Sequence, residues 1–261
     1  MNIRKKNFYA IRNLDRIKAY FRKIGKTLGL NRHNDYKKFI LLTRSRTGSN
    51  LLLSYLNVHP NIIADHEIFQ RPVKKPISKV LLKEFRKYPK SIKAVGFKIF
   101  YNHPLGEDNP FLWDTLVNMK DLYIIHLKRR NILRTLLSLK LALQSEKWVK
   151  YDSQKNDDMM SKTVSFDFDS LETGFNQTRQ WEIEGDEMFN DHPKLTIYYE
   201  DLVESPEETV KKVTDFLGLP PCQTRTYLVR QNPENSSDLI ENYKELKEGF
   251  SGSPWELFFD D

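Results

Sequence analysis

Short apolar runs alternate along this chain with segments whose apolar positions recur every three to four residues. The runs predict buried strands, and the recurring positions predict helices that bury one face. Strands are predicted at residues 38–42, 62–64, 92–100, 122–127 and 195–199, and helices at residues 49–59, 78–88, 110–119, 131–147 and 170–189. Strands that alternate with helices indicate an α/β fold with a central, mostly parallel sheet.

Turn and capping residues predict further boundaries near the end of the chain. Ser205, Pro206 and Glu208 form a capping box that predicts a helix start, and Gly218 predicts the end of that helix. The segment of residues 150–168 is polar and irregular, and we expect it to be a lid or substrate loop. The tail beyond Cys222 contains one or two further helices.

Residues 1–36 predict a basic amphipathic helix that precedes the main domain of residues 37–261. Basic residues are spread through this segment, which distinguishes it from a signal peptide. Such a helix either docks on the domain or lies on an anionic membrane surface as a peripheral contact. Its apolar positions are Phe8, Ile11, Leu14, Ile17, Phe21, Ile24 and Leu28.

Composition narrows the classes of partner. The formal net charge of +7 favours anionic partners, while the 39% of hydrophobic residues allows a packed core. The single cysteine, Cys222, excludes an internal disulfide and favours a reducing compartment such as the cytoplasm. No recognised motif or basic-aromatic stripe predicts nucleic-acid binding, so we expect none. The oligomeric state is left open, with a homo-oligomer among the alternatives.

The segment of residues 43–50 joins a predicted strand to a predicted helix and concentrates donors in one turn. Gly48 permits a backbone turn that side chains would block, and the helix start presents free N–H groups to an anion. The pattern G-x-x-x-x-G-K-[ST] of a Walker A loop is absent. Charged and hydroxyl donors come from Arg44, Ser45, Arg46, Thr47 and Ser49.

A second basic cluster follows the strand of residues 122–127, where Arg129 and Arg130 stand at the strand end. In α/β folds this is where ligands are contacted. A nucleotide hydrolase would carry an Asp here for Mg²⁺, so the site is expected to handle its donor without a metal. Ser138 lies eight residues after Arg130. Two separate anion sites fit a nucleotide that is phosphorylated at two positions.

These segments together resemble the superfamily of sulfotransferases that use 3′-phosphoadenosine 5′-phosphosulfate (PAPS). The loop Arg44 to Asn50 resembles the 5′-phosphosulfate loop, and Arg130 with Ser138 resembles the 3′-phosphate motif. The segment from Tyr199 to Pro220 is similar to the family's third motif. The matches keep their order over residues 38–221, and the nearer similarity is to bacterial carbohydrate sulfotransferases. The resemblance implies a three-layer, P-loop-like fold.

The resemblance also implies roles for single residues. Arg46 would contact the bridging and sulfuryl oxygens, Arg130 and Ser138 would hold the 3′-phosphate, and Tyr199 would approach the adenine. Arg230 would stand in for the family's C-terminal basic loop. The 5′-phosphate would be cradled by Ser45, Thr47, Gly48, Ser49 and Asn50, with added charge from Arg44.

The general base is left open between two neighbours. Glu67 aligns with the glutamate of carbohydrate-type members, and His66 is the alternative because its reference pKa suits proton transfer. The remaining histidines have no metal-ligand spacing.

The predicted function is transfer of a sulfuryl group from PAPS to a hydroxyl of a carbohydrate or similar small acceptor, by direct in-line displacement. Two alternatives remain at this point: a P-loop kinase or nucleotide hydrolase, and a non-catalytic module that binds anions or glycans.

Overall fold

The structure is a computed structural model that describes residues 32–70, 76–105, 110–145, 163–226, 228 and 234–260. Five parallel strands form the central sheet in the order β3-β5-β2-β6-β7. The strands are β2 (Lys37–Thr43), β3 (Ile62–Glu67), β5 (Ala94–Phe100), β6 (Leu122–Lys128) and β7 (Lys194–Tyr198). The predicted parallel α/β fold is therefore confirmed.

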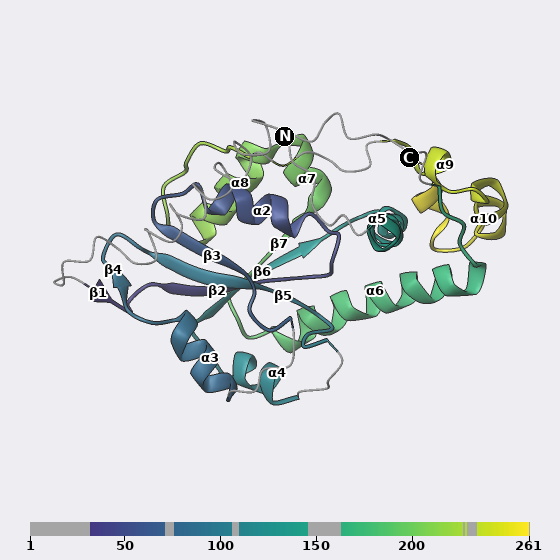
Figure 1. The fold of residues 1–261 in the computed structure, drawn as a ribbon. Helices are drawn as coiled ribbons and strands as arrows, with labels where there is room; N and C mark the ends of the chain where they lie inside the picture. The colour runs from purple at the N-terminus through teal and green to yellow at the C-terminus, as the bar shows by residue number, and fades with distance from the viewer. Residues whose placement is uncertain are drawn as a thin grey trace, which may run out of the picture.

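Helices cover both faces of the sheet, which gives three layers (Figure 1). One face packs on α2 (Ser49–Leu56), α7 (Tyr199–Glu204) and α8 (Pro206–Phe216) through an apolar cluster that includes Phe39, Leu41 and Ile125. The other face packs on α3 (Ile77–Glu84) and α4 (Pro110–Val117) through Ile40, Leu42 and Ile124. Successive residues of a strand point to opposite faces, which is why β2 supplies both cores.

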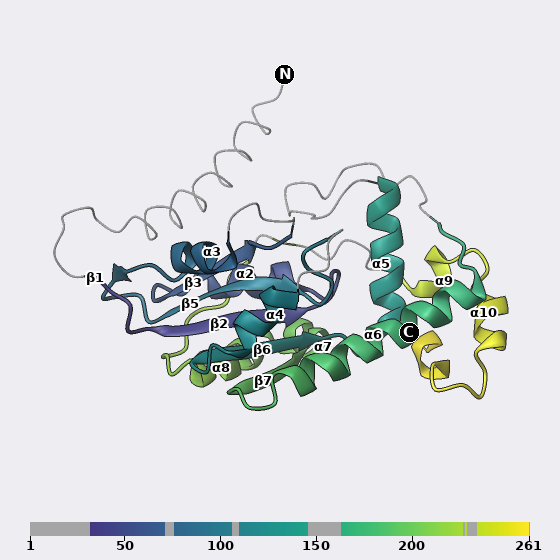
Figure 2. The same cartoon turned by 90° about the horizontal axis from the view of Figure 1, so that it is seen from below.

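Helix α5 (Ile132–Ser145) stands at the carboxyl end of the sheet and packs on α6 (Phe168–Met188), which runs from there back along the sheet (Figure 2). Beyond them lie the C-terminal elements α9 (Ser236–Leu239), α10 (Tyr243–Gly249) and η2 (Glu256–Phe259). Phe168 of α6 stacks on Phe250 with ring centroids 4.1 Å apart, and Phe175 packs against the same ring. The aromatic tail is thus part of a further core, separate from those on the two faces of the sheet, that includes residues of α5 and α6.

Several predicted boundaries are wrong in informative ways. The strand predicted at residues 62–64 continues to Glu67, which places both base candidates on β3. The helix predicted at residues 78–88 ends at Glu84, because the buried Tyr88 belongs to β4 (Tyr88–Pro89) and pairs with β1 (Arg32–His33).

The capping box at Ser205 is only partly present. Ser205 is the N-cap and Pro206 opens α8, but the Ser205 side chain makes no capping bond. Glu208 pairs instead with Lys212 one turn further along the helix, with 2.9 Å between Oε1 and Nζ. At the other end, Gly218 adopts φ 68 and closes the helix as predicted.

Two predicted segments fall largely outside the described residues. Of residues 1–36, for which a helix is predicted, Arg32–His33 forms β1, and residues 1–31 are outside the description. The predicted lid of residues 150–168 is described only from residue 163, and Val164 there forms a bridge with Ile240. None of the described helices is long and apolar enough to cross a bilayer.

Candidate functional site

The loop between β2 and α2 is built as a cradle for an anion. Two residues adopt left-handed backbone angles, Arg46 with φ 69 and Gly48 with φ 84, and Gly48 is the N-cap of α2. The buried Thr43 hydroxyl holds the turn from below, because it donates to the Leu127 carbonyl and lies 2.5 Å from the Thr47 hydroxyl. The N–H groups at a helix start attract negative charge, so the loop presents a fixed positive pole at the carboxyl edge of the sheet.

Arg46 brings the two sequence motifs together. Its Nε donates to the Ser138 hydroxyl at 3.0 Å, which joins the loop after β2 to the middle of α5. Burial lowers the pKa of the Arg46 guanidinium, an effect that Tyr199 partly opposes. Sequence spacing alone does not show that Arg46 and Ser138 meet, and this contact is the decisive geometric result for the site.

Arg129 and Tyr199 support the loop from the side. The Tyr199 ring lies so close to Gly48 that a Cβ there would be 2.3 Å from Cδ2 of the ring. Arg129 places its guanidinium carbon 4.3 Å from the centre of that ring and donates to the Arg46 carbonyl at 3.2 Å. Arg129 is buried, and the Glu200 carboxylate, 3.9 Å from Nε of Arg129, offsets part of its positive charge.

Arg130 is held by residues of β7 and α7, and not by Ser138 of α5. Its guanidinium makes two hydrogen bonds to the Asp201 carboxylate, at 2.7 and 3.0 Å, and lies 4.3 Å from the centre of the Tyr198 ring. The backbone N–H of Arg130 donates to Glu200. The predicted 3′-phosphate residues Arg130 and Ser138 share no hydrogen bond, since Arg130 pairs with Asp201 and Ser138 with Arg46.

The other loop residues lie in two environments. Arg44 turns toward α6, where it donates to the Thr178 hydroxyl and to the Gly174 carbonyl and lies 5.5 Å from the centre of the Trp181 ring. Burial lowers the pKa of Arg44 to about 10, although Glu182 and Tyr101 oppose the shift. Thr47 and Ser49 are buried, whereas Ser45 and Asn50 are half-buried. Arg230 lies outside the described residues.

A bulge in β3 separates the two base candidates. Asp65 pairs with Phe97 and Glu67 with Lys98, so His66 is the extra residue and its side chain is exposed. Bulges redirect side chains, and this one turns Glu67 toward Lys98, with 2.9 Å between Oε1 and Nζ. Burial alone would raise the pKa of Glu67, but the charge and hydrogen bond of Lys98 outweigh it and hold the pKa below its ordinary value.

Lys98 was not predicted from the sequence as a site residue, and His103 interacts electrostatically with both Lys98 and Glu67. The Lys98 side chain is only 2% exposed, and its ammonium donates to the Asn50 amide oxygen at 2.7 Å. Nε2 of the buried His103 has no hydrogen-bond partner among the described residues, and burial lowers the pKa of this imidazole to about 4. In the sequence, both residues stand at or just after the end of the strand predicted at residues 92–100, and this position could have indicated that they lie near the site.

Residues 110–246, just over half of the chain, match the model of the family described as Stf0 sulphotransferase. The chain belongs to the Stf0 sulphotransferase family. It is therefore an enzyme of the PAPS-dependent sulfotransferase superfamily, of the bacterial type. This assignment replaces the two alternatives that the sequence left open, a kinase or hydrolase and a non-catalytic binding module.

Curated relatives agree with the assignment of this sulfotransferase. It is 29% identical over 236 residues to Nodulation protein H of Rhizobium tropici, which covers 85% of this chain and 92% of the relative. It is 29% identical over 237 residues to Nodulation protein H of Rhizobium meliloti strain 1021, with 85% and 94% covered.

Solved structures give more distant similarities. A sulfotransferase from Alicyclobacillus acidocaldarius is 15% identical with a TM-score of 0.48, covering 85% of this chain and 93% of that chain. The mouse sulfotransferase SULT7A1, solved in complex with PAP, is 16% identical with a TM-score of 0.42, covering 91% and 79%.

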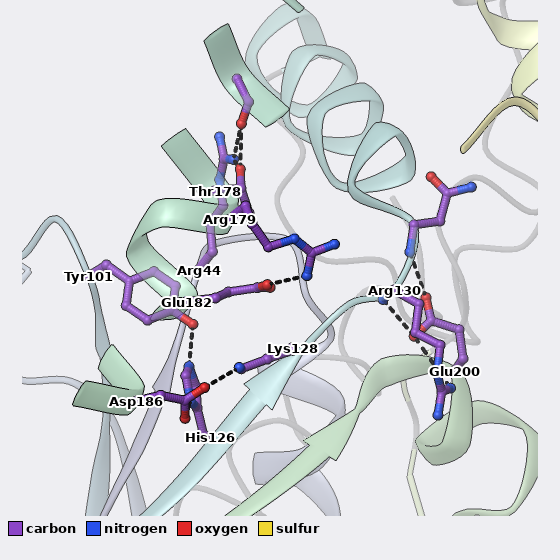
Figure 3. Close-up of polar contacts among 12 residues, drawn as sticks. Arg44, Tyr101, His126, Lys128, Arg130, Thr178, Arg179, Glu182, Asp186 and Glu200 are labelled. Atoms are coloured by element: carbon purple, nitrogen blue, oxygen red, sulfur yellow. Dashed lines mark hydrogen bonds and ion pairs between the residues drawn. The ribbon is translucent and has the colours of Figure 1, made fainter. Parts of the chain in front are cut away.

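A partly buried polar network anchors α6 of the sulfotransferase to the sheet, near the loop between β2 and α2 (Figure 3). The Tyr101 hydroxyl lies 2.6 Å from Nε2 of His126, and Nδ1 of His126 lies 2.9 Å from Asp186. Lys128 donates to the other oxygen of Asp186 at 2.6 Å. Burial and the charge of Lys128 lower the pKa of His126 to about 4, so the imidazole is neutral at pH 7. The network fixes the helix that carries the contacts of Arg44.

Within the described part of the chain, no group of three or more His, Cys, Asp or Glu side chains is placed to hold a metal ion.

Proposed function

We propose that this sulfotransferase transfers the sulfuryl group of PAPS to a hydroxyl of a carbohydrate or similar small acceptor. The observation that carries the proposal is the hydrogen bond between Arg46 and Ser138, because it joins two motifs that the resemblance assigns to opposite ends of the donor. The loop, in which Arg46 and Gly48 adopt left-handed backbone angles, and the start of α2 supply the N–H groups that a 5′-phosphosulfate requires.

The 5′-phosphosulfate would lie against the loop of residues 45–50, with Arg46 on the bridging oxygen. Arginine suits this role because its planar fork contacts several oxygens at once. Arg44 faces α6, and we propose that it shapes the wall of the site beside the sulfuryl group. Tyr199, which packs on Gly48 under Arg129, would lie next to the nucleoside.

The 3′-phosphate would take the place of the Asp201 carboxylate on Arg130. The Arg130 side chain is 51% exposed and that of Asp201 40%, and an exposed ion pair contributes only about 0–1 kcal/mol. A phosphate carries more charge and more acceptor oxygens than a carboxylate, so it can displace the weaker partner. Ser138 would complete this end of the site from α5.

The reaction would be a single in-line displacement. The acceptor oxygen forms a bond to sulfur while the bond from sulfur to the bridging oxygen breaks, and that electron pair leaves on adenosine 3′,5′-bisphosphate. The acceptor's proton passes to the Glu67 carboxylate. Arg46 and the N–H groups of the α2 start stabilise the charge that grows on the leaving phosphate. His66 is the exposed extra residue of the bulge, and Glu67 is therefore the stronger candidate for the base.

A carbohydrate acceptor is supported by the resemblance of the motifs to bacterial carbohydrate sulfotransferases. The relatives named Nodulation protein H, which cover 85% of this chain, are in keeping with a bacterial enzyme of this type.

The test is incubation of the enzyme with PAPS labelled in the sulfuryl group and a panel of glycans and simple alcohols. We expect labelled product and an equal amount of adenosine 3′,5′-bisphosphate with at least one glycan. Glu67→Gln should reduce kcat by about 100-fold or more, as expected for loss of a general base, and the exposed Glu204→Gln should not. Release of bisphosphate with water as the sole acceptor would contradict the proposal.

A further inference from the structure

Lys98 is a buried cation on β5, one strand from the centre of the sheet. Lysine is almost never fully buried unless it is paired, and the Lys98 side chain is 2% exposed. Its ammonium reaches two oxygen acceptors, Oδ1 of Asn50 at 2.7 Å and Oε1 of Glu67 at 2.9 Å. The ammonium also lies 5.2 Å from the centre of the Phe100 ring, within the range of a cation–π contact.

The two acceptors belong to the two halves of the proposed site. Asn50 is the second residue of α2, the helix whose start faces the donor loop, and Glu67 is the proposed base. The β3 bulge places Glu67 opposite Lys98 in the strand register, so the geometry requires both the parallel pairing and the extra residue. A single ammonium therefore spans the donor loop and the acceptor side.

We propose that Lys98 is a positioning residue that links the donor loop to the base: its ammonium holds the Asn50 amide on one side and the Glu67 carboxylate on the other, and it shares its charge with the donor's anion once the donor is bound. This inference rests on the proposed function, because it takes Glu67 as the base and the loop as the donor site. Its consequence is that Glu67 becomes a stronger base only after the donor has bound.

The charges around Glu67 explain why its pKa should rise when the donor binds. Lys98 acts from β5 and His66 from β3 itself, while Arg46 of the loop acts on Lys98. His103, in the turn after β5, has a pKa lowered to about 4 and adds no charge at pH 7. In the empty enzyme the positive charges prevail and hold the pKa of Glu67 below its ordinary value. An anion bound beside Arg46 and Asn50 offsets that positive potential, so the affinity of Glu67 for a proton increases.

The coupling makes the strength of the base depend on the presence of the donor. A base that is weak in the empty site and gains strength with the donor is matched to proton transfer during the displacement. By reciprocity, protonation of Glu67 must strengthen binding of the anion by the same factor. A lysine that only filled space in the core would produce neither effect.

The experiment measures the titration of Glu67 directly by carboxyl carbon NMR, with the resonance assigned by its absence in Glu67→Gln. In the wild-type enzyme, saturating adenosine 3′,5′-bisphosphate should raise the pKa of Glu67 by about one pH unit. In Lys98→Met the pKa should already be higher without the nucleotide, because burial is no longer offset, and the further shift should be at most about half as large. Lys98→Arg keeps the charge and should keep the shift.

Two further variants keep the result decisive if Lys98→Met does not fold. Asn50→Leu removes the contact between α2 and Lys98 but leaves the ion pair, so the starting pKa of Glu67 should stay and the nucleotide-dependent shift should shrink. Lys38→Met, which removes an ion pair with Asp121 at the far end of the sheet, is the control and should change neither value.

Equal nucleotide-dependent shifts in the wild type and in Asn50→Leu would overturn the inference, as would a wild-type shift of zero. These results are distinguishable from failure of the proposed function. Absence of bisphosphate binding would reject the donor assignment, and full transfer activity in Glu67→Gln would reject the base.

Discussion

Gly48 shows how much of the site depends on one residue without a side chain. Its φ of 84 is left-handed, and the Tyr199 ring occupies the space that a Cβ would need. Its place in the loop was predictable from the sequence, because glycine between a strand and a helix signals a turn. The contact with Tyr199 was not, since the two residues are brought together only when β2 and β7 flank β6.

Gly48→Ala should therefore destabilise the enzyme and weaken nucleotide binding. The matched control is Gly252→Ala, since Gly252 has φ 72 but a Cβ added there would meet no atom within 4 Å, so this variant carries only the backbone cost. We expect Gly48→Ala to lower the free energy of unfolding by about 1–3 kcal/mol more than the control, because Tyr199 must move. Denaturant unfolding measures both variants, and equal losses would show that Tyr199 does not limit the loop.

Ser138 offers a second test at the scale of one residue. Ser138→Ala removes the hydroxyl that accepts from Arg46, so kcat/KM for the donor should fall by roughly three- to tenfold. Ser145→Ala on the same helix, where the hydroxyl bonds to the Leu141 carbonyl, should leave kcat/KM unchanged. Steady-state kinetics with varied PAPS compares them, and equal values for the two variants would argue against the contact.

Lys98 marks the limit of sequence reasoning for single residues. A lysine within an apolar strand suggests a solvated edge, yet Lys98 is buried on β5 between β3 and β2. Its partners Asn50 and Glu67 come from two other elements, and one of them depends on a bulge. No local pattern in the sequence encodes that arrangement.

At the scale of elements, helix α6 is held to the sheet by a polar network as well as by apolar packing. His126 is fully buried in β6, and the close approach of Gly185 to Leu42, Tyr101 and His126 lets the helix lie directly on the strands. The sequence predicted both elements, but not that α6 returns along the sheet to meet β6. The helix start at Phe168 is capped by Asp167, whose side chain accepts from the Ser170 N–H.

This network should make stability depend on pH. Because the pKa of His126 is lowered from 6.5 to about 4, the unfolded chain takes up a proton between those values that the folded enzyme does not. Stability should therefore fall as the pH drops from 6.5 to about 4. His103, whose pKa is lowered to about 4 as well, contributes to the same slope.

His126→Gln tests this assignment. The variant should be less stable at pH 7 by about 1–3 kcal/mol, since buried partners lose a hydrogen bond. Between pH 4 and 6.5, its free energy of unfolding should also depend less steeply on pH, because one fewer proton is taken up on unfolding. Unfolding by denaturant at pH 4.5, 5.5 and 7 measures both quantities. A slope identical to that of the wild type would show that His126 does not titrate as the structure indicates.

At the scale of the whole molecule, the parallel sheet explains why residues far apart in the sequence share one edge. The loops after β2, β3, β5 and β6 all leave the carboxyl end of the sheet, so Arg46, Glu67, His103 and Arg130 are directed to one side of the fold. This much follows from the α/β pattern of the sequence. The pairing of Arg130 with Asp201 does not, because it depends on how α7 follows β7.

In the proposed complex, two clusters of donors hold the two phosphorylated ends of one nucleotide. Calorimetric titration of the enzyme with adenosine 3′,5′-bisphosphate and with adenosine 5′-phosphate tests it most directly. Each hydrogen bond to a charged group contributes about 1.5–3 kcal/mol, so the bisphosphate should bind at least about tenfold more tightly. Arg130→Gln should abolish that preference, while Lys211→Gln on the exposed face of α8 should preserve it. Equal affinity of the wild-type enzyme for the two nucleotides would contradict the account.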